Sequence, residues 1–490
     1  MRITYALLAA ALCIASSAPA QTSSPVTTNN GTPPTSPTPS LPSAPPVALP
    51  APGVTLPGTQ MPTPPTSPIQ QLPQSLTAPL VPSNAPSLTV GQAEQLALQH
   101  NPRVTVARLL ALAEGQVVRE QRAAEMPTLA ANLTAVGADS GTRITAGALN
   151  NPVLYQRAAA GVTLNQLISD FGRTRNLVAQ ASLNAQAAQS TLEATRDDIV
   201  FAVDEAFYRA LGAQALIQVA IETVNARQSS AAQIQALANA RLRSTLDLSF
   251  ANAQLAQAQL LLLDARNQSE TAQADLAALL GEDTGVVYRL VDETPAAPPA
   301  APGEVAPLIQ QAFGQRPDLR SLQQQANAAH RFATAERDLS LPTINALGAT
   351  GTAPWRDSQI GSATYGAAGV NVTIPVFNGF LYTARATEAK LRASAADAQV
   401  QQLRDNITRD VTTTVLQAQE NFNRIAVAQQ LLTQANSALA LAQTRYQLGL
   451  SSIVELNDAQ LLQTQAEIEL ANARYAYQGS LSAIRYQTGQ

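Results

Sequence analysis

Few side chains of this sequence could carry catalytic or metal chemistry. The 490 residues include two histidines, one cysteine and, among 30 basic residues, the single lysine Lys390. His100 and His330 stand far apart, with no partner at the spacing of a metal site or a nucleophile–base pair. The sequence contains no glycine-rich phosphate-binding motif. It therefore predicts a protein that is not an enzyme, with no catalytic residues, no metal site and no cofactor.

The charge balance argues against a nucleic-acid partner. The chain has 34 acidic and 30 basic residues and a net charge of −4, whereas nucleic-acid-binding domains are basic. Aromatic residues make up 4% of the chain, so a large aromatic core is not expected either. We expect helices and strands built from small side chains.

The first 88 residues predict export and a spacer. Residues 1–20 combine Arg2, an apolar stretch and a small-x-small cleavage site, as secretory signal peptides do. Leu12 precedes Cys13, where a lipoprotein signal has a small residue, so lipidation is not expected. Residues 21–88 contain 19 of the 32 prolines and no charged residue, which predicts an extended, disordered linker.

The remaining chain contains two copies of one unit. Landmarks recur at a constant offset of 208 residues, so that Gly161 matches Gly369 and Gly281 matches Gly489. Further upstream the offset is 215. Such repetition indicates a duplicated supersecondary unit. We expect a first repeat over 89–292, an inter-repeat linker over 293–303 and a second repeat over 304–490.

Each copy contains two runs in which apolar residues alternate with small or polar ones. They cover residues 128–137 and 158–168 in the first copy, and 343–350 and 365–376 in the second. Alternation over about ten residues suits transmembrane barrel strands, and equally a soluble hairpin packed on a helix. Trp355 and Tyr365 flank the second hairpin loop, where either membrane-interface aromatics or plain loop contacts would lie.

A very long helix is predicted after each pair of strands. Residues 380–448 contain no glycine or proline, and residues 173–244 are interrupted only by Gly212. Helices of this length indicate a coiled coil. The chain then returns through 248–280 and 456–484. Four strands per chain cannot close a barrel, so a membrane barrel requires several chains, with eight strands from two or twelve from three.

Several segments, in this order, resemble outer-membrane efflux proteins of the TolC family across residues 89–490. The most specific of them is residues 446–460. The others are Asn101-Pro102, Asp170-Phe171-Gly172-Arg173, Arg316-Pro317-Asp318-Leu319 and Pro375-Val376-Phe377-Asn378-Gly379.

The resemblance implies a membrane α+β fold, in which a shared antiparallel β-barrel with four strands per chain continues into a long α-helical coiled-coil tunnel. It also implies a homotrimer in the cell outer membrane, with its tunnel in the periplasm. Its partners would be a periplasmic adaptor (membrane fusion) protein and an inner-membrane transporter. The function implied is the passive exit duct of a tripartite efflux or type I secretion system.

The resemblance also implies roles for residues at the tunnel tip. Glu455 and Asp458, three residues apart and hence on one helix face, match acidic residues that face the pore constriction. Adaptor docking is expected on both tips, through residues Tyr446, Gly449, Leu450, Ser451, Arg241, Arg243 and Asp247. Tyr446 matches a tyrosine whose hydrogen bonds hold the closed state in the family, but Ser451 replaces that family's basic residue.

Other functions are compatible with parts of the pattern. A trimeric coiled-coil adhesin or structural envelope protein would use the same long helices, without alternating strands. A periplasmic adaptor would have one helical hairpin flanked by β-domains, whereas this chain has two hairpins. A hydrolase is the remaining alternative.

Overall fold

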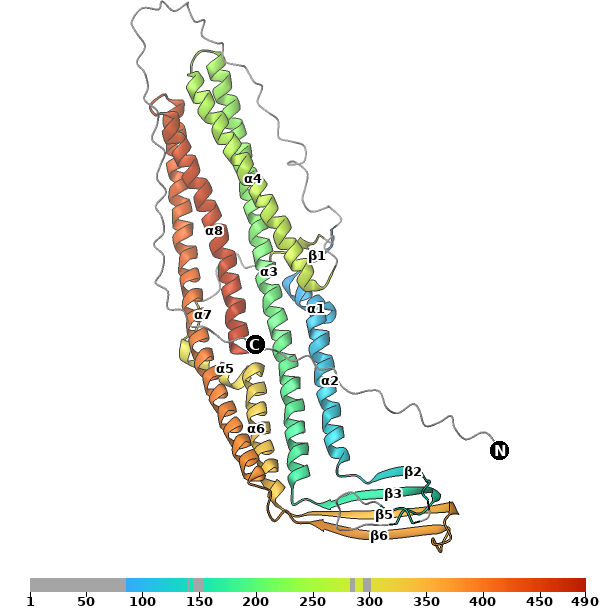
Figure 1. The fold of residues 1–490 in the computed structure, drawn as a ribbon. Coiled ribbons are helices and arrows are strands. Elements are labelled where there is room, and N and C mark those ends of the chain that lie inside the picture. Colours follow the sequence, from blue (N-terminus) through green and yellow to red (C-terminus); the bar gives the residue numbers. More distant parts are fainter. Residues whose placement is uncertain (1–84, 140, 144–152, 283–286, 294–300) are drawn as a thin grey trace, which may run out of the picture. The chain divides into compact units, whose positions relative to one another are not determined.

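The described part of the chain is built from two copies of a strand-and-helix unit, drawn in Figure 1. The computed structural model describes residues 85–139, 141–143, 153–282, 287–293 and 301–490. All of these residues belong to one compact unit within 68–490. The predicted signal peptide and most of the predicted linker lie outside the described residues.

Corresponding elements appear in the same order in the two copies. The first copy comprises α1 (Val90–His100), α2 (Pro102–Ala123), β2 (Thr128–Val136), β3 (Arg157–Ser169), α3 (Arg173–Asn239) and α4 (Thr245–Leu280). The second comprises α5 (Val305–Gln315), α6 (Pro317–Arg337), β5 (Thr343–Arg356), β6 (Thr364–Thr373), α7 (Leu381–Gln447) and α8 (Ile453–Thr488). A short 3-10 turn, Asp338–Ser340, follows α6. Since α3 and α7 both have 67 residues, and α4 and α8 both have 36, the duplication is confirmed.

Several boundaries differ from the sequence prediction. Strand β5 extends to Arg356, beyond the predicted end at 350, and α3 ends at Asn239 rather than near 244. Strand β1 (Ser87–Leu88) lies at the end of the predicted linker over 21–88. It pairs with β4 (Arg289–Leu290) of the predicted first repeat. The linker assignment is wrong at this end because the Leu88 side chain is buried among residues of α1, α3 and α4. Burial of that apolar side chain fixes the strand.

The four longer strands form one antiparallel sheet in the order β2-β3-β5-β6. Its register aligns Leu129 with Leu164, Ala131 with Val162, and Ala346 with Val370. Most of the larger apolar residues of the four strands therefore share one face, with Leu167 and Leu347 as exceptions, and the other face carries small residues with several asparagine and threonine side chains. This is the pattern of a barrel wall with one face in lipid and one in water.

Helix α3 has neighbours along its whole length on two sides. It packs against α2 and α4 of its own copy, and against α6 and α8 of the other copy. Because α4 is about half as long as α3, it covers only one half, and α2 covers the other. The expected simple helical hairpin is thus a long helix paired with two shorter helices placed end to end (Figure 1).

Two equivalent junctions hold these shorter helices end to end. Gly281 ends α4 with φ of 73°, and a Cβ there would lie 2.9 Å from the carbonyl oxygen of His100. Asn101 fixes the same junction, donating from Nδ2 to the carbonyl oxygen of Leu279 at 2.9 Å. In the second copy a Cβ at Gly489 would lie 2.9 Å from the backbone nitrogen of Arg316. The Asn101-Pro102 and Arg316-Pro317 segments noted in the sequence each form one of these two junctions.

No helix in the described residues combines the length and apolarity that a membrane crossing requires.

Candidate functional site at the turns between the long helices

The two turns joining α3 to α4 and α7 to α8 share one backbone geometry. In the second turn, Leu450 N donates to Arg445 O and Gly449 N donates to Tyr446 O. In the first, Leu242 N donates to Leu237 O and Arg241 N to Ala238 O. Both are Schellman C-caps, which need one residue in the left-handed region. Gly449 occupies that place with φ of 74°, and Arg241 occupies it with φ of 59°.

Arg243 of the first turn joins the two turns through Tyr446. Its guanidinium carbon lies 4.3 Å from the centre of the Tyr446 ring, and its Nη2 donates to the Tyr446 carbonyl oxygen at 2.7 Å. The Tyr446 ring is only 7% exposed and packs among residues of α3 and α4. A cation–π contact and a charged hydrogen bond thus connect residues 203 positions apart.

The Tyr446 hydroxyl takes no part in this contact. It is buried and has no hydrogen-bond partner among the described residues. The Ser451 hydroxyl is likewise buried without a partner there. Burial, with Asp247 nearby, raises the pKa of Tyr446, while Arg243 acts in the opposite direction. Arg243 is therefore the basic partner of Tyr446 in this chain, and it contacts the ring and the backbone.

The two acidic residues of the tip differ in their surroundings. Glu455 lies in the first turn of α8, where the Ser452 hydroxyl caps the helix by accepting from Glu455 N. Its carboxylate is 3.2 Å from Arg445 Nε. Asp458 is exposed one turn further along. Because Arg445 neutralises part of the Glu455 charge, Asp458 presents the freer negative charge in an isolated chain.

The remaining predicted tip residues lie at the surface of the same region. Leu450 and Arg241 are exposed, and Asp247 is half-buried in the first turn of α4. The structure therefore brings the two predicted docking tips together, in contact through one arginine. The sequence did not predict that contact, although the absence of a basic residue after Gly449 is consistent with a basic partner from the other copy.

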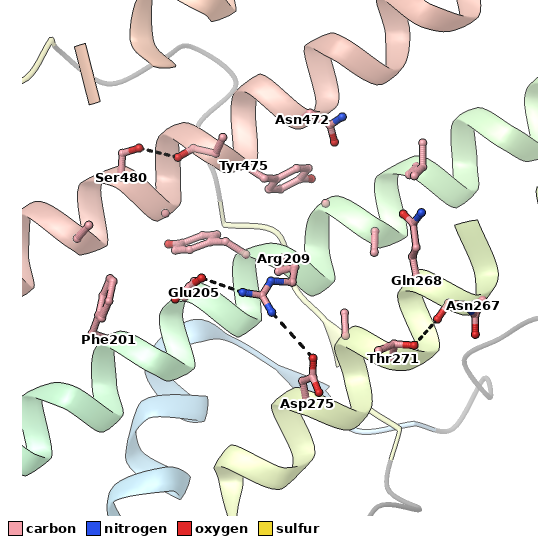
Figure 2. A pocket seen from close by; sticks show the side chains of 18 residues that line it. Phe201, Glu205, Arg209, Asn267, Gln268, Thr271, Asp275, Asn472, Tyr475 and Ser480 are labelled. Carbon is pink, nitrogen blue, oxygen red and sulfur yellow. Dashed lines mark hydrogen bonds and ion pairs between the residues drawn. The ribbon is translucent and has the colours of Figure 1, made fainter. Parts of the chain in front are cut away.

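Residues of α3, α4 and α8 line a groove of about 860 Å³ (Figure 2). Arg209 lies in it, 2.8 Å from Glu205 and 3.9 Å from Asp275. Tyr475 borders the groove and donates to Asp292. Gly212, the one break in the glycine-free run of α3, lines the groove beside Tyr475, and a Cβ there would lie 3.6 Å from the Tyr475 ring, an ordinary contact distance. Sequence reasoning noted that glycine and missed the groove.

A carboxyl pair lies between α1 and α3, formed by the half-buried Glu94 and the buried Asp204. Asp204 is 3% exposed, and one of its oxygens has no partner among the described residues. Burial, and then the hydrogen bond and charge of Asp204, raise the pKa of Glu94 from 4.5 to about 7, against the opposing effect of Arg485. Glu94 is therefore expected to hold a proton in the folded chain at mildly acidic pH.

We expect the stability of the α1–α3 contact to depend on pH through Glu94. A raised carboxyl pKa stabilises the folded state below the unfolded value of 4.5, and this contribution is lost as the pH rises through about 7. After allowance for solvent screening, the loss is about 1–2 kcal/mol. Thermal unfolding from pH 5 to pH 8 should show it, and Glu94→Gln should flatten the profile. An unchanged slope in that variant would contradict the assignment.

The described residues contain no group of three or more histidine, cysteine, aspartate or glutamate side chains able to hold a metal ion.

Comparison with known proteins agrees with this architecture. The family model for the outer membrane efflux protein matches residues 94–282 and 308–490, one match for each copy. The chain belongs to the outer membrane efflux protein family. This is a family of transport channels rather than a class of enzymes.

Individual relatives of the family are distant in sequence and close in fold. The outer membrane protein OprJ of Pseudomonas aeruginosa is 26% identical over 352 residues, covering 70% of this chain and 71% of OprJ. The solvent efflux pump outer membrane protein SrpC of Pseudomonas putida is 24% identical, covering 74% and 77%. A crystal structure of the channel-forming protein CusC superposes with a TM-score of 0.72 at 20% identity, covering 82% of this chain and 92% of that one. The predicted fold class, barrel strands continued by a helical tunnel, is confirmed.

Proposed function

We propose that this chain forms, as a homotrimer, the outer-membrane exit duct of a tripartite efflux or type I secretion system. The duct conducts substrates passively and catalyses no reaction. Its partners are a periplasmic adaptor and an inner-membrane transporter. The observation that carries the proposal is that one chain leaves both its sheet and its helical layer incomplete, on surfaces that a second copy of the chain would complete.

The incomplete helical surface lies on α7. Helix α3 packs against its own α1, α2 and α4 and against α6 and α8 of the second copy, whereas the main helix contacts of α7 in the described residues are with α5, α6 and α8 of its own copy. Because α7 is the counterpart of α3, its uncovered side should receive α2 and α4 of a neighbouring subunit. Repeat units of this kind bury a continuous core only by stacking.

Residue correspondence predicts the contacts of this interface. Ser190 of α3 donates to Gln324 of α6 at 3.0 Å, and the counterparts of these residues are Ala398 of α7 and Leu109 of α2. Leu109 is 60% exposed in the single chain. An exposed leucine on a helix is explained if α7 of a neighbour covers it.

A pair of cysteines should link neighbouring subunits through this interface. Thr223 and Thr464 face each other with 3.5 Å between their hydroxyl oxygens, and their counterparts are Leu431 and Ala256. Leu431→Cys with Ala256→Cys should give covalent dimers and trimers on oxidation. The mature chain is expected to contain no other cysteine, since Cys13 lies in the predicted signal peptide.

The matched control for this experiment is Thr223→Cys with Thr464→Cys, which has the same local geometry inside one chain. It should close a disulfide without forming any ladder of larger species. A ladder in the control, or monomers alone in the interface pair, would contradict the proposed arrangement.

The sheet supports the same conclusion. Strands β2 and β6 each have one unpaired edge in the single chain, and unpaired edges are not tolerated in lipid. Pairing β6 with β2 of the next subunit keeps the alternation antiparallel. Three chains then give twelve strands, and the larger number leaves an open interior where eight strands would be filled by side chains.

At the tips, we assign Asp458 and Glu455 to the pore constriction. In a trimer each position becomes a ring of three carboxylates, which attracts cations and repels anions. The turns themselves, with Tyr446, Gly449, Leu450 and Ser451 on one side and Arg241, Arg243 and Asp247 on the other, form the adaptor-docking surface. The SrpC relative is by name part of an efflux pump, which supports an adaptor and a transporter as partners.

Gly449 provides a test of docking that leaves the trimer unchanged. A Cβ at Gly449 meets no atom within 4 Å, so a larger side chain projects outward from the tip. Gly449→Trp should abolish export in cells while trimers still form, and Gly449→Ala, with the same left-handed strain of about 1–2 kcal/mol, should retain most export. Normal export by the tryptophan variant would remove Gly449 from the docking surface.

The channel function itself is tested by planar-bilayer recording of the purified protein. We expect discrete conductance steps. An adhesin, an adaptor or a hydrolase would give none, so a silent bilayer containing correctly folded protein would overturn the proposal.

A further inference from the structure

One row of residues crosses the sheet on its polar face. The register places Asn132 of β2 beside Gly161 of β3, Gly161 beside Gly351 of β5, and Gly351 beside Tyr365 of β6. In this row two neighbouring strands thus carry glycine, and the next strand carries a tyrosine. Tyr365 therefore lies on the polar face, away from the apolar face on which a membrane-interface aromatic would be expected. Trp355, which the register aligns with Ala158, lies on the apolar face.

The Tyr365 side chain lies across the two glycines. A Cβ added at Gly161 would overlap the Tyr365 hydroxyl, and one added at Gly351 would lie 2.6 Å from the ring carbon that carries it. No L side chain fits at either position while the ring stays there. The ring covers backbone that would otherwise be bare, as aromatic residues do beside glycines in sheets.

We propose that Tyr365 sets the width of the outer part of the transport passage, and that Gly161 and Gly351 form a seat that keeps its ring against the wall. This inference rests on the proposed function, in which the polar face lines the lumen and the trimer contributes three such rings. A seated ring leaves the passage open. A methyl group added at Gly161 would occupy the place of the Tyr365 hydroxyl against the wall, so a displaced ring turns toward the lumen.

A double-mutant cycle tests the seat. Gly161→Ala should displace the ring and lower the single-channel conductance, whereas Tyr365→Ala should conduct at least as well as the wild type. The double variant Gly161→Ala/Tyr365→Ala should recover the conductance of Tyr365→Ala, because no ring remains to be displaced. Conductance is recorded in the wild-type background and with Arg243→Ala. Because Arg243 holds the two tips together, that variant is expected to have an open periplasmic end that does not limit the current.

The cycle separates a seat from general damage to the sheet. The Gly161→Ala methyl group would also lie 2.9 Å from the carbonyl oxygen of Thr350. A conductance loss caused by that contact would persist in the double variant and would overturn the inference, as would a Gly161→Ala channel that conducts normally. Trp355→Ala, on the other face, is the matched control and should leave conductance unchanged; an equal effect there would also overturn it. A wild-type protein without conductance would instead overturn the proposed function, and this inference with it.

Discussion

Replacing Arg243 with alanine is expected to open the periplasmic end of the channel and raise its conductance. In the single chain Arg243 holds the first tip against Tyr446 of the second, through a cation–π contact at 4.3 Å and a hydrogen bond at 2.7 Å. Together these are worth about 2–3 kcal/mol per subunit. Their loss shifts the balance between joined and separated tips about 30- to 150-fold in each subunit.

Two further variants identify which atoms hold the tips together. Because the Tyr446 hydroxyl has no partner among the described residues, Tyr446→Phe should behave like the wild type. A latch made by the tyrosine hydroxyl, as the resemblance implies, predicts instead that Tyr446→Phe opens the channel. Arg241→Ala is the matched control, since Arg241 is an exposed arginine of the same turn that makes no contact with the Tyr446 ring. Equal conductance in Arg243→Ala and the wild type would exclude this contact as a latch.

Substituting Gly281 or Gly489 is expected to destabilise the protein more than Gly449→Ala does, because the added side chain also meets backbone. Both residues have φ near 75° at the end of a helix, and a Cβ at either would approach backbone atoms to 2.9 Å. Left-handed strain costs about 1–2 kcal/mol, and forcing the helix ends apart costs about 1–3 kcal/mol more. Gly281→Ala and Gly489→Ala should therefore lose about 2–5 kcal/mol each.

Thermal unfolding and the yield of assembled trimers would measure this loss. Gly314 is the matched control, because it lies inside α5, has no positive φ and has nothing within 4 Å of an added Cβ. Gly314→Ala should be neutral or stabilise by up to about 1 kcal/mol, since alanine is the better helix former. If Gly281→Ala is as stable as Gly314→Ala, the junction does not hold α4 and α2 together.

Local patterns were sufficient for the elements and their duplication. The absence of glycine and proline over 380–448 predicted α7 within a few residues, and alternation in 128–137 predicted β2, because helix and strand periods depend on neighbouring residues. The start of α1 is likewise local, since Thr89 and Gln92 cap it reciprocally as a capping box. Strand β5 runs past its predicted end because pairing with β3, rather than its own alternation, sets its length.

Contacts between distant segments had no local pattern to reveal them. The Arg243–Tyr446 contact, the Gly281–His100 junction and the Tyr365 seat each join residues from separate elements, the first two more than 170 positions apart. Periodicity indicates which face of an element is buried, but the register and the packing partner decide what covers it. The amino-acid order therefore established two copies of a wall-building unit, while the folded chain established how the copies are joined and which of its surfaces a neighbouring subunit must cover.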